Sequence, residues 1–111
     1  MTRKIAVVIK TDNTVEVIDI EKDTLAQLQK GVGGYVQAID LSADVSMWLN
    51  EEGKLIGLPH NTLGQKHWDK AFGPGTDTVM GDIVLTGGVD GEGDTIGLTV
   101  HQLFDLSAVQ L

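Results

Sequence analysis

The first twenty residues carry two β-branched runs that predict an N-terminal β-hairpin. The runs cover residues 4–10 and 15–20, and Asp12-Asn13 between them can adopt the positive φ values of a tight turn. Apolar side chains occur on both faces of the second run. We therefore expect both faces of this part of the sheet to be partly covered.

Two stretches further along the chain predict β-strands, and in the second of them Val45, Met47 and Leu49 alternate with Ser46 and Trp48. They cover residues 35–41 and 45–49. After a turn at Glu51-Glu52-Gly53, residues 54–58 are predicted to return as a strand beside the second stretch. Pro59 would end that strand because proline has no amide proton to donate to a neighbour.

Three Thr-x-x-Gln sequences stand where the apolar pattern changes to a helical period. They span residues 24–27, 62–65 and 99–102. In such a capping box the Thr oxygen accepts a hydrogen bond from the amide three residues on, and the Gln side chain bonds back to the Thr amide. The sequence therefore predicts three short helices.

The order of these elements predicts a single α+β domain over residues 1–111. A strand at residues 78–85 and a short closing strand at 96–98 complete the order ββα-β-ββ-α-β-(β)-α. Strands joined by hairpins favour a mainly antiparallel sheet, and the pattern lacks long βαβ alternation. A chain of 111 residues has room for one hydrophobic core.

The charge balance of the chain bears on its possible partners and not on its fold class. Eight basic residues stand against 16 acidic ones, and the net charge of −8 opposes binding to phosphate backbones. We therefore expect no direct contact with nucleic acid. An acidic surface that mimics DNA and inhibits restriction enzymes stays open as an alternative, and the same acidity suits a partner protein with a basic surface.

Cysteine usage and hydropathy indicate the cell compartment. The chain has no cysteine, which excludes disulfides, thiolate metal sites and cysteine nucleophiles. Its apolar stretches are too short for a signal peptide or a membrane span. These features predict a soluble protein of a reducing cytoplasm without contact with membranes. Assembly into a homo-oligomer stays open.

The glycines of Lys-Gly-Val-Gly-Gly-Tyr, residues 30–35, invite comparison with a phosphate-binding loop. Such loops precede a helix, whereas these glycines follow a predicted one. Gly31 is therefore predicted to end the helix in a left-handed conformation. Gly33 and Gly34 are candidates for a close backbone approach to a small ligand or to another strand.

The acidic residues after the last long strand offer a weak metal-binding pattern. Asp90, Glu92 and Asp94 alternate as in the first half of a calcium loop. The glycine and the glutamate that should follow are replaced by Thr95 and His101. We therefore predict an acidic turn and no metal cofactor.

The three histidines are the basis of the main catalytic alternative, a metal-dependent hydrolase. His60, His67 and His101 lack the i,i+4 spacing that places two imidazoles on one metal ion. A metal-dependent hydrolase, in which the fold gathers them with Asp82 or Asp94, stays open. His67 lies on the apolar face of its predicted helix, where a histidine inside the core is the other interpretation.

Several of these motifs, taken together, resemble a protein family. They are Val32-Gly33-Gly34 after a short helix, Asn-Glu-Glu-Gly-Lys-Leu at residues 50–55, Leu-Pro-x-Asn at 58–61, and Gly81-Asp82 before a hydrophobic strand. Together they resemble a family of small proteins of actinobacterial phages and mobile elements, known only as a domain of unknown function. The resemblance implies an accessory protein in the cytoplasm of a bacterial host, and it supplies no activity, cofactor or catalytic residue.

We expect a non-enzymatic binding protein, because the sequence has no convincing catalytic constellation. Its partner would be a host protein, or a small ligand such as a nucleotide signal, and its action would counter host defence. Polar side chains near the predicted turn, two glycines and both tryptophans are the candidate binding residues. They are Gly33, Gly34, Trp48, Asn50, Glu51, Glu52, Lys54, His60, Asn61 and Trp68.

Overall fold

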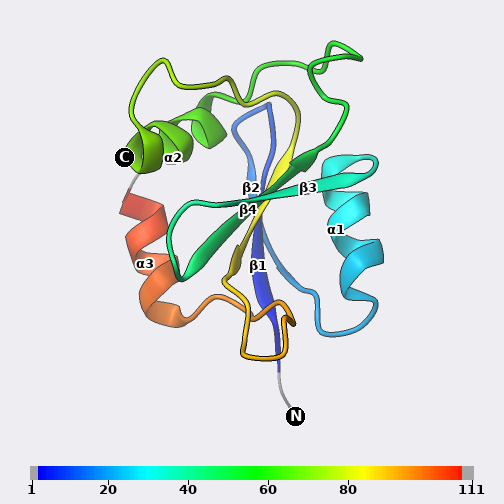
Figure 1. Ribbon diagram of the computed structural model, residues 1–111, viewed down its shortest axis with the longest axis vertical. Coiled ribbons are helices and arrows are strands. Elements are labelled where there is room, and N and C mark those ends of the chain that lie inside the picture. The colour runs from blue at the N-terminus through cyan, green and yellow to red at the C-terminus, as the bar shows by residue number, and fades with distance from the viewer. Residues whose placement is uncertain (1–2, 109–111) are drawn as a thin grey trace.

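A computed structural model describes residues 3–108 as an antiparallel five-stranded sheet with three helices (Figure 1). The strands are β1 (Ile5–Ile9), β2 (Val15–Asp19), β3 (Val36–Asp40), β4 (Val45–Asn50) and β5 (Ile83–Gly87). The helices are α1 (Thr24–Val32), α2 (Thr62–Phe72) and α3 (Val100–Ala108). Neighbouring strands are antiparallel throughout, in the order β2-β1-β5-β4-β3. The predicted α+β class and mainly antiparallel sheet are confirmed.

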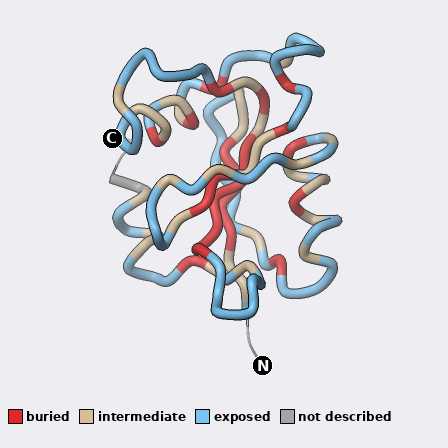
Figure 2. Tube along the Cα trace, in the orientation of Figure 1, coloured by how far each residue is buried: buried red, intermediate tan, exposed pale blue. Residues whose placement is uncertain are grey.

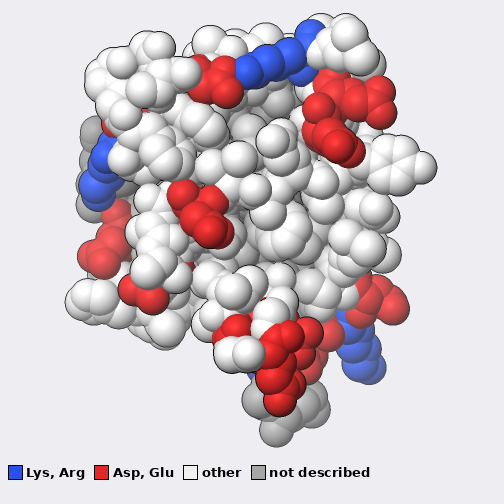
Figure 3. Space-filling model, viewed as in Figure 1, with Lys and Arg blue, Asp and Glu red and all other residues white. Residues whose placement is uncertain are grey.

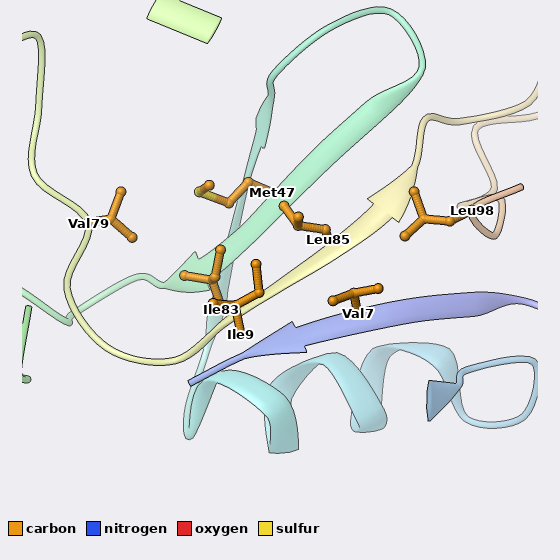
Figure 4. Close-up of a cluster of buried hydrophobic side chains, with 7 residues drawn as sticks. All are labelled: Val7, Ile9, Met47, Val79, Ile83, Leu85 and Leu98. Carbon is orange, nitrogen blue, oxygen red and sulfur yellow. The ribbon is translucent and has the colours of Figure 1, made fainter. Parts of the chain in front are cut away.

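The sheet carries helices on both faces, so the core has two parts. α1 covers one face, and α2 with α3 covers the other (Figure 1). Burial is concentrated in the central strands (Figure 2). On the α1 face, Leu28 and Val32 pack with Ala6, Val8 and Val84. The cluster on the opposite face is drawn in Figure 4 and contains Val7, Ile9, Met47, Val79, Ile83, Leu85 and Leu98.

The N-terminal hairpin has the turn that the sequence predicts. Asn13 adopts φ 71°, and the Asp12 carboxylate accepts hydrogen bonds from the Thr14 amide (2.9 Å) and hydroxyl (2.6 Å). β1 pairs with β2 on one side and with β5 on the other. Its unbroken apolar run contributes to both parts of the core, because successive side chains of a strand point to opposite faces.

The strand predicted at residues 54–58 is wrong, because β4 already has a partner along both edges. β3 and β5 pair with β4, so no further strand can join it. Residues 51–57 form consecutive turns instead. In these turns the Ile56 amide donates to Glu52 O (2.9 Å), and the Leu58 amide donates to Gly53 O (2.9 Å).

The last part of the sheet is shorter than predicted. The strand expected at residues 78–85 begins only at Ile83. The closing strand expected at 96–98 is also wrong. These residues run beside the start of β1 and attach to it through a hydrogen bond from the Leu98 amide to Ile5 O (2.8 Å).

One of the three predicted capping boxes forms. At the start of α3 the Thr99 hydroxyl accepts from the Gln102 amide (3.1 Å), and Gln102 Oε1 accepts from the Thr99 amide (2.9 Å). The box predicted for α1 is wrong, because the helix follows a left-handed Asp23 (φ 53°) whose side chain caps nothing. The box predicted for α2 is wrong because Asn61 caps that helix.

α1 ends two residues later than predicted. Gly31 lies within the helix, where an added Cβ would come within 2.6 Å of Val84 Cγ2. Its missing side chain therefore lets the helix approach β5. Gly33 takes the left-handed conformation (φ 77°), and the amides of Gly33 and Gly34 both donate to Gln29 O (2.8 and 3.1 Å).

The close approach of Gly97 to β1 leads to a stability prediction. A Cβ at Gly97 would lie 2.5 Å from Ile5 N and 2.8 Å from Lys4 Cα, both backbone atoms. We expect Gly97→Ala to lower the free energy of unfolding by about 2 kcal/mol, because the backbone must shift to make room. Gly91→Ala is the control, since nothing lies within 4 Å of a Cβ there. Equal urea midpoints for the two variants would contradict the prediction.

Candidate functional site

The segment between β4 and α2 projects from one end of the molecule (green, top of Figure 1). It carries two adjacent aliphatic side chains, Leu55 (84% exposed) and Ile56 (57% exposed), which we call the apolar tip. The turns at residues 51–57 hold the backbone beneath these side chains through the hydrogen bonds given above. The apolar tip is thus presented to solvent on an ordered support.

A small pocket opens next to the turn that carries the apolar tip. Its volume is about 120 Å³. Four of the candidate residues line it, namely Asn50, Glu51, Lys54 and Trp68. The other lining side chains are Gln37, Ile39, Leu49, Asp77, Thr78 and Met80. β3, β4, α2 and the chain before β5 therefore all contribute to this hollow, which we call the Trp68 pocket.

Trp68 is held in place on α2 by polar and apolar contacts. Its indole Nε1–H donates to the Thr76 hydroxyl at 2.8 Å, and its ring centre lies 4.7 Å from that of Phe72 in a tilted arrangement. Trp68 also packs against the buried cluster of Figure 4. The indole therefore forms a fixed wall of the pocket, as an anchor site for a partner requires.

An ion pair joins two residues that line the Trp68 pocket. The Lys54 ammonium donates to the Asp77 carboxylate, and this hydrogen bond lowers the pKa of Asp77 below its ordinary value. The Thr78 amide, 2.8 Å from the same carboxylate, lowers the pKa further. The two side chains are 57% and 43% exposed, so the pair adds little to stability. Its main effect is to orient Lys54 at the edge of the pocket.

Asn50 lies at the end of β4 and is buried rather than displayed. Its side-chain Nδ2 donates to Val32 O (3.2 Å), and its Oδ1 accepts from the Glu52 amide (2.8 Å). A Cβ at Gly34 would lie 2.8 Å from the same Nδ2. The close backbone approach expected of Gly34 is therefore made to Asn50, whose side chain ties the end of α1 to the projecting segment.

Asn61 is fully buried, which excludes it from direct contact with a partner. Its side chain joins the end of β1, the loop before β5 and the start of α2. The neighbouring His60 is exposed, with its Nε2 3.1 Å from Gln65 Oε1. The His-Asn pair thus divides into one accessible residue and one residue that supports the fold.

The other candidates do not all join the same site. Trp48 packs on the α1 face of the sheet, and its Nε1–H donates to the Thr86 hydroxyl at 2.9 Å. Since Trp68 packs on the opposite face, the two indoles cannot form one anchor. Gly33 is exposed at the end of α1, and Glu51 and Glu52 are exposed at the base of the apolar tip.

The structure does not gather the histidines and acids of the proposed hydrolase. His60 precedes α2, His67 is buried within that helix, and His101 is exposed on α3. Asp82 accepts a hydrogen bond from a backbone amide of the β1–β2 turn (2.9 Å). Over residues 3–108, no group of three His, Cys, Asp or Glu side chains could hold a metal ion.

The acidic residues form local structure or scattered surface charge. Asp90 Oδ1 accepts from the amides of Glu92 (2.8 Å) and Asp94 (3.0 Å), which is the acidic turn that the sequence predicts. On the face drawn in Figure 3, Asp and Glu lie in separate groups, with a few Lys or Arg side chains nearby. This face lacks the parallel rows of negative charge that a mimic of duplex DNA would need.

The sequence pattern misses the two exposed aliphatic residues of this site, Leu55 and Ile56. Residues 54–58 read as a strand, in which Leu55 and Ile56 would point to opposite faces and one would be buried. The turn exposes both. Gly53 and Gly57 flank the Lys-Leu-Ile sequence, and this pair of glycines is the signal that could have indicated a turn.

No helix within residues 3–108 is long and apolar enough to cross a membrane.

Comparison with known proteins places the chain in a family. We found no match to a curated protein or to a solved structure. A family model described as Domain of unknown function (DUF3846) matches residues 1–109, which include every motif that carries the resemblance. The chain therefore belongs to the DUF3846 family, a domain of unknown function.

Proposed function

We propose that this chain is a non-enzymatic binding protein that docks onto another protein through the apolar tip and the Trp68 pocket. The observation that carries the proposal is the exposure of Leu55 (84%) beside Ile56 on a hydrogen-bonded turn. Burying a large aliphatic side chain contributes roughly 1.5–3 kcal/mol. Folding leaves both side chains in water, so a partner that covers them gains this free energy.

The ordered support of the apolar tip favours tight binding. A flexible loop loses conformational entropy when a partner fixes it, and this cost lowers affinity. Here the amides of Ile56, Gly57 and Leu58 already donate to carbonyls within the segment. A partner therefore meets side chains whose backbone is in place.

The size of the Trp68 pocket supports a protein as the occupant of this pocket rather than a nucleotide. Pockets for small molecules usually measure roughly 300–1,000 Å³. A volume of about 120 Å³ is too small for a nucleotide but accommodates one side chain of a partner protein. Trp68 would contact the inserted side chain, and Lys54 at the edge would contact polar groups around it. These features favour a host protein over a nucleotide signal.

The chemistry and context suggest what kind of protein the partner is. The net charge of −8 favours a partner with basic residues around the contact. The resemblance to proteins of actinobacterial phages and mobile elements suggests a protein of the bacterial host, met in its cytoplasm. Occupying such a protein so that host defence is weakened is the role that we propose.

Serine substitutions at the apolar tip test this proposal. We expect the double variant Leu55→Ser, Ile56→Ser to bind the partner at least about tenfold more weakly, because two buried aliphatic side chains are lost from the interface. The measurement is a pull-down from a bacterial host lysate with the wild-type chain and the variant as baits. The retained protein is then purified, and its Kd is determined for each bait.

A matched control tests whether weaker binding is specific to the apolar tip or follows from the loss of any exposed leucine. Leu25→Ser changes a leucine of α1 that is 58% exposed and does not line the Trp68 pocket. This variant should bind as the wild-type chain does, and circular dichroism should show native helix content for all three baits. Equal retention by the tip variant and the wild-type chain would refute the proposed docking surface.

A further inference from the structure

A second and larger cavity lies between α2 and α3, on the same face of the sheet as the Trp68 pocket but separate from it. Its volume is about 290 Å³, close to the lower limit for small-molecule sites. Most of its wall is aliphatic, from Leu41, Val45, Ala71 and Leu106. We call it the α2–α3 cavity.

His67 is the buried polar residue of this wall, whose other polar residues, Ser42, Lys70 and Asp105, are exposed. His67 is only 3% exposed, and its Nε2 atom has no hydrogen-bond partner among the residues that the structure describes. Burial, with a smaller contribution from the Lys70 ammonium, lowers the pKa of His67 to about 4. The imidazole is therefore neutral at pH 7, and Nε2 can donate or accept one hydrogen bond according to the tautomer.

An unpartnered buried nitrogen is unusual in a folded protein. Buried polar groups nearly always have a partner, because leaving one without costs free energy. The His67 ring lines the α2–α3 cavity, and the torsion about its Cβ–Cγ bond has broad energy wells. Nε2 itself is fully buried, so a molecule in the cavity reaches this atom only when the ring turns about that bond.

We propose that the α2–α3 cavity binds a small, mainly apolar molecule with one hydroxyl group that hydrogen-bonds to Nε2 of His67. The aliphatic wall takes the apolar body of the molecule, and about 290 Å³ suits a single ring with a short substituent. Lys70 and Asp105 also line the cavity and are exposed, so they can contact polar groups at its opening. This site is independent of the proposed protein-binding surface.

Phenol and benzene form a matched pair of probes, because they differ by one hydroxyl. We expect phenol to bind the wild-type chain saturably and at least about tenfold more tightly than benzene, as one buried hydrogen bond allows. In His67→Phe this preference should fall to less than about twofold, since the ring stays but the nitrogen is lost. Titration calorimetry and ring-nitrogen NMR shifts of His67 report the binding.

Two further variants keep the test decisive. Ala71→Trp should abolish binding of both probes, because the new side chain fills the cavity, and His101→Phe should keep the preference, because His101 lies outside it. The Leu55→Ser, Ile56→Ser variant should bind phenol normally, which separates this site from the docking surface. Absence of saturable phenol binding, or an unchanged preference in His67→Phe, would overturn the assignment.

Discussion

Asn61→Asp is expected to leave the protein largely unfolded at neutral pH. Asn61 is fully buried, and its Nδ2 donates to Ile9 O and to Gly81 O, both at 2.9 Å. Its Oδ1 accepts from the Gly64 amide at 2.8 Å. Aspartate has the same shape, but it places an oxygen where the two carbonyl oxygens need a donor. It also brings a negative charge into a site without a cation among these contacts.

The expected loss reaches the lower end of the stability range of a small domain. Leaving a buried charge without compensation costs roughly 3–5 kcal/mol, and small domains are stable by roughly 5–15 kcal/mol. Circular dichroism and urea titration at pH 7 measure this change. The variant should show a much lower midpoint than the wild-type chain, or no folded baseline.

Asn13→Asp is the control for this substitution. Asn13 is exposed at a hairpin turn, and both Asn and Asp tolerate its left-handed conformation (φ 71°). The control changes the net charge by the same amount without burying it. If Asn61→Asp unfolds at the same urea concentration as Asn13→Asp, the role assigned to the Asn61 side chain is wrong.

Acidification is expected to destabilise the protein through His67. The pKa of this residue is about 4 in the folded chain, against an ordinary value of 6.5. Between pH 6.5 and 4 the unfolded chain therefore binds a proton that the folded chain does not. Stability is full above pH 6.5 and falls as the pH is lowered, by roughly 3 kcal/mol at pH 4, since each pKa unit is worth about 1.4 kcal/mol.

Urea titrations between pH 7.5 and pH 4 measure this effect. Carboxylates also titrate in the lower part of this range, so the informative quantity is the difference between variants. His67→Phe should lose roughly 3 kcal/mol less than the wild-type chain as the pH falls. His101→Phe removes a histidine whose side chain is 89% exposed, and it should keep the wild-type pH dependence. Identical pH profiles for His67→Phe and the wild-type chain would show that His67 is not responsible.

The structure gives architectural reasons for several family-like motifs. The Asn50 side chain reaches Val32 O, and the Gly81 amide donates to Pro59 O at 2.7 Å. With Asn61 these contacts tie the loops at one end of the sheet together. The apolar tip and the acidic pair beside it are not needed for these contacts. The binding function that we propose would account for those residues.

Local pattern predicted most elements but, apart from the N-terminal hairpin, not how the strands pair. β-branched runs predict β1 and β2, and alternating side chains predict β4, because strand propensity and the two-residue period are local properties of the chain. A turn signal at Glu51-Glu52-Gly53 followed by a short apolar run at residues 54–58 led to a false strand. Whether such a segment joins a sheet depends on a free edge, and both edges of β4 are taken, one by β3 just before it in the chain and the other by β5, which is distant in sequence.

The sequence predicted only part of the candidate site, because it shows residue types but not which side chains the fold buries. Polar and aromatic residue types pointed to Glu51, Lys54 and Trp68, and the structure brings these three into one pocket. The sequence also selected Asn50 and Asn61, which are buried. A polar side chain looks the same in a sequence whether it faces water or bonds to backbone groups inside the fold.

By itself, the sequence determined the α+β class, the N-terminal hairpin, the three helices and the acidic character of the chain. These properties depend on residue type and on spacing over a few residues, where sterics and hydrophobic periodicity act locally. Only the tertiary structure decided the strand order, the exposure of Leu55 and Ile56, and the burial of Asn61 and His67. Such features depend on contacts like the bond between Asn61 and Ile9, which lie 52 residues apart, and local spacing carries no information about which distant segments will meet.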